Sequence, residues 1–75
     1  MRAKVDEQAH LLSANNRLRY AVYLISVQQA RVENLTAAGL NAALAEDLLC
    51  LMNAILRNFI RHRQLILDSI ERGHQ

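Results

Sequence analysis

Proline is absent from the chain, and glycine occurs only twice in its 75 residues. Proline breaks the interior of a helix and glycine weakens it, so a chain nearly free of both permits long uninterrupted helices. Cysteine occurs once, at Cys50. A single cysteine excludes a disulfide within the chain and is typical of proteins in a reducing compartment. These absences favour one all-helical domain over residues 1–75.

Strong charge and long apolar runs are also missing. Nine Lys and Arg residues against seven Asp and Glu residues give a net charge of +2, which neither requires nor excludes an acidic partner. The longest apolar run, residues 48–60, contains Asn53, Arg57 and Asn58 and is too short to cross a bilayer. The first residues lead into no apolar segment of the kind found in signal peptides. We therefore expect a cytoplasmic protein with no membrane partner.

Gly39 lies between two long helical patterns and predicts a turn. Glycine adopts positive φ at no steric cost, which suits the residue after a helix, and Leu35 and Leu40 then take the apolar positions of a Schellman motif. Asn41 follows as a favoured N-cap, able to accept from the backbone N–H two or three residues on. Short connections place helices antiparallel. The sequence predicts an all-α antiparallel hairpin, with helices over about 2–38 and 42–72 and a turn at Gly39, Leu40 and Asn41.

The first helix carries a heptad pattern that predicts contact with the second. Its apolar residues recur at the a and d spacing, with polar residues in the two gaps, at Leu11, Asn15, Leu18, Val22, Ile25, Gln29 and Val32. A polar residue in such a seam usually fixes the register or oligomeric state. We expect the intrachain seam to contain Leu18, Val22, Ile25, Leu48, Ile55 and Phe59.

Apolar residues also lie outside the predicted seam, and on the second helix they cover about half of the circumference. A lone hairpin buries one stripe of each helix, and domains this small rarely gain enough from a single core, so oligomerisation is expected. Tyrosine suits an interface because its ring buries area while its hydroxyl finds a polar neighbour. We expect a homodimeric four-helix bundle, with interface residues Leu12, Tyr20, Tyr23, Val27, Leu49 and Leu56.

A basic zone offers an alternative function. If position i faces roughly position 80 minus i, Arg63 and His62 lie across from Arg17 and Leu18. Arg63 falls within the apolar arc and therefore needs a polar partner or must extend to solvent. The hairpin would then gather basic residues that could neutralise the phosphates of RNA or DNA, namely Arg17, Arg19, Arg57, Arg61, His62 and Arg63. No aromatic residues interleave with them, which weakens this alternative.

A metal site is a second alternative. Glu7 and His10 have a Glu-x-x-His spacing, and Glu71 lies near them across the predicted hairpin. A homodimer would supply four Glu and two His, the ligand count of di-iron carboxylate bundles. The spacing is common by chance and falls at the helix ends, so surface residues are the simpler interpretation, and we expect no cofactor.

The residues offer no catalytic machinery. Cys50 has no histidine within a helical turn, and the chain contains no glycine-rich phosphate loop or paired-cysteine zinc motif. We therefore expect no enzyme, but an interaction or regulatory module that acts through homo-oligomerisation and a protein partner.

The segment from Gln28 to Arg72 contains several short patterns: Arg31-Val32-Glu33-Asn34-Leu35, Ala38-Gly39-Leu40-Asn41, Leu48-Leu49 and His62-Arg63. In these the chain resembles a group of small, uncharacterised bacterial helical-hairpin proteins. The resemblance covers a little over half of the chain and implies the hairpin fold, with no activity attached to it. Asn41-Ala42 stands here where that group has Asp-Thr, a departure that leaves the physics of the turn unchanged.

Overall fold

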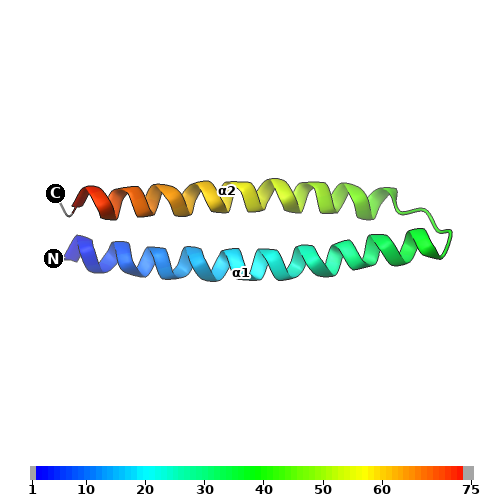
Figure 1. Ribbon diagram of the computed structural model, residues 1–75, viewed down its shortest axis with the longest axis horizontal. Coiled ribbons are helices and arrows are strands. Elements are labelled where there is room, and N and C mark those ends of the chain that lie inside the picture. The colour runs from blue at the N-terminus through cyan, green and yellow to red at the C-terminus, as the bar shows by residue number, and fades with distance from the viewer. Residues whose placement is uncertain (1, 74–75) are drawn as a thin grey trace.

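Two long helices lie side by side and antiparallel (Figure 1). The computed structural model describes residues 2–73, and the side chains of residues 6–73. Helix α1 extends over Arg2–Ala37 and helix α2 over Ala43–Gly73, and residues 2–73 include no strand. The predicted all-helical hairpin is confirmed, with the inner end of each helix one residue further from the turn than expected.

The turn has the predicted Schellman geometry. Gly39 has a φ of 72°, in the left-handed region that glycine adopts without penalty. The Leu40 N–H donates to the Leu35 carbonyl at 2.9 Å, and the Gly39 N–H donates to the Thr36 carbonyl at 3.0 Å. These two bonds satisfy carbonyls that the end of α1 would otherwise leave without partners. Gly39 therefore ends α1 as the sequence predicts.

The start of α2 is capped by Asn41. Its Oδ1 accepts from the Ala43 N–H at 2.9 Å, as expected for a capping residue. The Ala42 carbonyl accepts the first helical bond of α2, from the Glu46 N–H at 2.8 Å. Ala42 is also one of the few buried residues of the hairpin. The cap and the buried alanine together fix where α2 begins.

Partly covered side chains recur at alternating spacings of three and four residues on both helices. We call this set the seam: Glu7, Leu11, Ala14, Leu18, Ala21, Ile25, Gln28, Val32 and Leu35 on α1, Ala42 just before α2, and Ala45, Leu49, Met52, Leu56, Phe59, Arg63, Ile66 and Ile70 on α2. These spacings are those of the a and d positions of a coiled coil. The two helices therefore pack from Glu7 to Leu35 on α1 and from Ala45 to Ile70 on α2.

The predicted seam on α1 is only half right. Its first set, Leu11, Leu18, Ile25 and Val32, is covered as expected. In the second set Asn15 is partly covered, Gln29 is exposed, and Ala14, Ala21 and Gln28 take the positions that face α2. Val22 is exposed. Alanines add little to an apolar pattern, yet their small side chains allow the close approach of two helices. The pattern therefore favoured the larger Val22 over Ala21 as the residue that faces α2.

On α2 the predicted seam is rotated by one residue. Phe59 is partly covered as expected, but Leu48 and Ile55 are exposed. Leu49 and Leu56, which were predicted for an oligomer interface, lie in the seam and are partly covered. One residue is a rotation of about 100° around a helix. Because apolar residues cover half of α2, the sequence alone did not resolve this rotation.

The core of the hairpin is thin. The molecule measures 57 × 14 × 12 Å, and its radius of gyration is 17.1 Å, against about 11 Å for a compact domain of this length. Among the described side chains only Ala14, Gln28 and Ala42 are buried, and no large side chain is fully buried. The chain exposes 5938 Å², roughly a quarter more than a compact monomer of 8.5 kDa.

Candidate interaction surface

One side of the seam carries a continuous apolar surface. We call it the groove flank, and it consists of Arg17, Tyr20, Leu24, Val27 and Arg31 on α1 with Leu44, Leu48, Leu51 and Ile55 on α2. Within each helix these residues are three or four positions apart, so they share one face. Most of the apolar members are exposed. The flank thus presents leucine, isoleucine, valine and tyrosine side chains to solvent.

Grooves between the two helices show that both stripes lie on the same side. A groove of about 300 Å³ is lined by residues of both helices: Arg17, Tyr20, Ala21, Leu24, Ile25, Met52, Ile55 and Phe59. A second, of about 520 Å³, lies nearer the turn and is lined by Gln28, Arg31, Leu35, Asn41, Leu44, Ala45 and Leu48. The two grooves follow one another along the groove flank.

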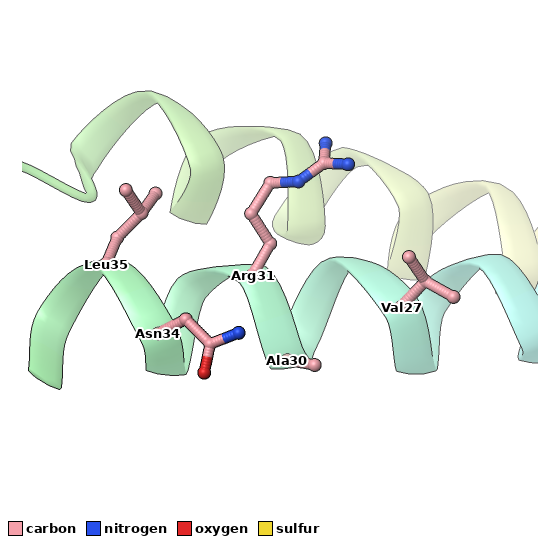
Figure 2. Close-up of a pocket in the computed structure, with 5 residues that line it drawn as sticks. All are labelled: Val27, Ala30, Arg31, Asn34 and Leu35. Atoms are coloured by element: carbon pink, nitrogen blue, oxygen red, sulfur yellow. The ribbon is translucent and has the colours of Figure 1, made fainter.

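Figure 2 shows the part of this flank where α1 approaches the turn. The side chains of Arg31 and Leu35 point toward α2, whereas Asn34 points away from it. Together with Val27 and Ala30 they line a shallow hollow of about 490 Å³. Arg31 therefore borders both this hollow and the groove beside it.

The groove flank carries positive charge at its ends and no negative charge. Arg17 and Arg31 are fourteen residues apart on α1, a distance of about 21 Å along a helix. No Asp or Glu residue belongs to either stripe. Protein interfaces are typically depleted in Asp, Glu and Lys and enriched in Tyr and Arg. The composition of the flank is therefore that of an interaction surface.

The other side of the seam is more polar. We call it the opposite flank, and it consists of Asn15, Val22, Gln29 and Thr36 on α1 with Glu46, Asn53, Ile60 and Leu67 on α2. Only Val22 and Ile60 among these are large exposed apolar residues. The Asn53 side chain donates to the carbonyl of Leu49 within its own helix, at 3.1 Å. The two sides of one hairpin thus differ in chemistry.

Arg63 and Asn15 form a hydrogen bond across the hairpin. The Arg63 Nε–H donates to Oδ1 of Asn15, and both residues are partly covered. A guanidinium in an apolar seam needs such an acceptor. The sequence predicted that Arg63 needs a polar partner or extends to solvent, and that Asn15 fixes the register or the oligomeric state, but it did not pair these two residues.

The register of the hairpin differs from the predicted one. The facing residues in the three long-range hydrogen bonds add to between 73 and 78, below the expected 80. Arg63 therefore faces Asn15 and not Arg17. Figure 1 shows the reason, because the connecting segment runs back beside the last turn of α1 before α2 begins.

Gln28 is a polar seam residue that the sequence prediction missed. It is 4% exposed, and its Nε2 donates to the Ala45 carbonyl at 3.0 Å. Its Oε1 accepts from Nη1 of Arg31 at 3.3 Å. The signal was present in the sequence, since Ala14, Ala21 and Gln28 follow one another at intervals of seven. Gln28 fixes the turn end of the hairpin as Asn15 fixes its middle.

The predicted basic zone is not one surface. Arg17 lines the groove flank, and Arg63 lies in the seam with its Nε–H donated to Asn15. Arg19 is only two residues from Arg17, so the two side chains leave α1 in nearly opposite directions. Arg57 and Arg61 are exposed, but neither lines any of the grooves described above. His62 is also exposed, and it lies seven residues beyond Ile55, on the same face of α2 as the groove flank.

The predicted metal ligands are not gathered within one hairpin. Among the described residues, no group of three His, Cys, Asp or Glu side chains is placed to hold a metal ion. Glu7 lies in the seam, where its Oε1 accepts from the Ser69 hydroxyl at 3.3 Å. His10 and Glu71 are both exposed. Glu7 therefore contributes to the contact between the helices at the open end.

The remaining predicted interface residues are exposed. Tyr20 and Val27 belong to the groove flank, and Leu12 lines a hollow beside Tyr20 that continues along α1. Tyr23 lies outside both flanks, on the outer surface of α1. Cys50 is exposed as well. The apolar surface available to a partner thus extends beyond the seam on α1 and α2 alike.

Comparison with known proteins adds no relative. No protein-family model, curated protein or solved structure matches the chain. Within residues 2–73, neither helix has a stretch apolar and long enough to cross a bilayer. We therefore infer function from the surface chemistry of the hairpin.

Proposed function

We propose that the protein is a small, non-enzymatic interaction module that homodimerises into a four-helix bundle and acts on a protein partner in that form. The observation that carries the proposal is the thin core. No large side chain among the described residues is fully buried, while apolar residues of both helices face solvent. A four-helix bundle covers such faces by packing two hairpins around a common core.

The exposed area is sufficient for a stable dimer. The chain exposes 5938 Å², against about 4,650 Å² expected for a compact monomer of its mass. A standard protein interface buries about 800 Å² from each partner. The excess is larger than this requirement, so an interface of standard size would bring the accessible area of each chain closer to that of a compact monomer.

Sedimentation equilibrium over nanomolar to micromolar concentrations tests the proposal. We expect a particle of twice the 8.5 kDa chain mass at micromolar concentration, with helical circular dichroism. Unfolding should shift to higher denaturant as the protein concentration rises, because association stabilises only the folded chain. A folded monomer throughout this range would refute the proposed dimer.

A further inference from the structure

We infer that a second copy of this chain docks on the groove flank, so that the two groove flanks face each other across a two-fold axis. This inference rests on the proposed homodimer and specifies its surface. The flank combines stripes from both helices: Tyr20, Leu24 and Val27 with Leu44, Leu48, Leu51 and Ile55. The seam of each copy would then lie in the interior of the bundle.

The shape of the surface favours a second copy as the occupant. A two-fold interface uses the same patch on both subunits, and such a patch must complement itself. Here each hairpin offers protruding leucines on α2 beside grooves lined by residues of both helices, among them Leu48 and Ile55. Ridges of one copy can therefore enter grooves of the other.

The accessible area of the hairpin also favours a second copy as the partner. The apolar stripes of the groove flank extend from Tyr20 to Val27 on α1 and from Leu44 to Ile55 on α2, and both border the grooves. The accessible area in excess of a compact monomer is larger than the roughly 800 Å² that one partner contributes to a standard interface. Because these apolar stripes lie on both helices, they suit a partner that contacts both helices at once.

Two arginines would form the rim of this interface. Arg17 and Arg31 border the apolar stripes at their two ends, and the Arg31 side chain also donates to Gln28. Long basic side chains at the edge of an interface cover apolar area with their stems while their charged ends stay in water. The centre between them holds Leu24, which carries no charge to desolvate.

The opposite flank is a poorer docking surface. It presents Asn15, Gln29 and Asn53 between its apolar residues. Burying these amides against another hairpin would remove their contact with water, at a cost unless each found a new partner. The groove flank requires no such compensation at its centre.

A matched pair of substitutions on α2 tests the docking surface. Leu51 is 57% exposed and belongs to the groove flank, whereas Ile60 is 52% exposed and belongs to the opposite flank. The two residues are nine positions apart, which is about half a turn beyond two full turns of the helix. We expect Leu51→Glu to raise the dimer dissociation constant at least about a hundredfold, because it places a carboxylate in the interface. Ile60→Glu should change it less than about threefold.

Sedimentation equilibrium of the wild type and both variants separates the outcomes, with helical circular dichroism as the check on folding. Leu51→Ala, which adds no charge, should weaken the dimer about tenfold. If the wild type is a dimer that Ile60→Glu dissociates and Leu51→Glu or Leu51→Ala does not, the docking surface is wrong and the homodimer stands. If both Glu variants dissociate equally, the assignment to one flank is also overturned. If the wild type is a folded monomer, the proposed function itself is refuted.

Discussion

The two flanks of this hairpin border the same seam but carry different side chains. The groove flank presents exposed leucine, isoleucine, valine and tyrosine side chains between two arginines. The opposite flank supplies Asn15, whose side chain accepts from Arg63 in the seam, and several other polar residues. Because the helices and the turn are common to both flanks, the difference arises from residue choice alone.

Polar and apolar residues have two different roles in this hairpin: the first select its register, and the second favour association. Polar contacts such as Asn15–Arg63 have a direction and a fixed distance, so they select one register of the two helices. Apolar side chains have no such direction, and their burial gives free energy to any surface that covers them. The polar residues therefore define the hairpin, and the exposed apolar ones favour association.

After the Leu51 and Ile60 variants, the next largest effect on this difference between the flanks is expected from tyrosine substitutions on α1. Tyr20 is 64% exposed on the groove flank, and Tyr23 is 61% exposed outside both flanks. We expect Tyr20→Ala to raise the dimer dissociation constant by tenfold or more, since tyrosine is enriched among the interface residues whose truncation costs about 2 kcal/mol or more. Tyr23→Ala should leave the constant nearly unchanged. Equal weakening in the two variants, measured by sedimentation, would remove the distinction between the surfaces.

A smaller effect, on the unfolding free energy, is expected from substitutions of the pair Asn15 and Arg63. Asn15→Leu removes the acceptor from the Arg63 guanidinium, and we expect a loss of about 1–2 kcal/mol in unfolding free energy because Arg63 is only partly covered. The double variant Asn15→Leu with Arg63→Leu should recover at least this loss, since an apolar pair leaves no charge without a partner. Urea unfolding at one fixed protein concentration measures both. If Asn15→Leu alone were as stable as the wild type, the hydrogen bond between Asn15 and Arg63 would contribute nothing to the unfolding free energy.

The smallest effect on stability is expected from a substitution in the turn, which belongs to neither flank. A Cβ added at Gly39 would meet no atom within 4 Å, so Gly39→Ala bears only the cost of positive φ, about 1 kcal/mol. Gly73→Ala is the control, since no atom lies within 4 Å there either and its φ is not in the left-handed region. We expect lower stability for Gly39→Ala in urea unfolding, with an unchanged dissociation constant for the folded chain. A weaker folded dimer would show that the turn also shapes the docking surface.

The turn and the helices could be predicted from sequence because their causes are local. A single glycine with an asparagine two residues later is sufficient for the Schellman ending and the cap. Each of these features depends on atoms within a few residues, and the structure shows the expected hydrogen bonds of Gly39, Leu40 and Asn41.

The facing residues could be predicted only in part, because packing is not local. On α1 the alanines at 14 and 21 allow the helices to approach, yet they weigh little in an apolar pattern. On α2 a wide apolar arc made Leu48 and Leu49 equally good candidates for the seam, and the structure places Leu49 there. The pairing of Asn15 with Arg63 depends on the path of residues 38–42, which no periodicity encodes.

The exposed apolar residues were predicted more accurately on α1 than on α2. Leu12, Tyr20, Tyr23 and Val27 are exposed as expected, but Leu49 and Leu56 are not the leucines that α2 presents to solvent. Their neighbours Leu48 and Ile55 take that place. A shift of one residue turns a helix by about 100°, so a small error in register exchanges core and surface.

The position of the Gly39 turn has a consequence for the order in which the hairpin forms. The contact between Gln28 and Ala45 closes a separation of 17 residues, whereas the contact between Glu7 and Ser69 closes one of 62. Closing the longer loop first would cost about 1 kcal/mol more in chain entropy. We therefore expect the helices to pair from the turn outward, with Leu44 and Leu48 held in place while the open end is still unpaired. We expect the part of the groove flank beside the turn to form before the open end closes.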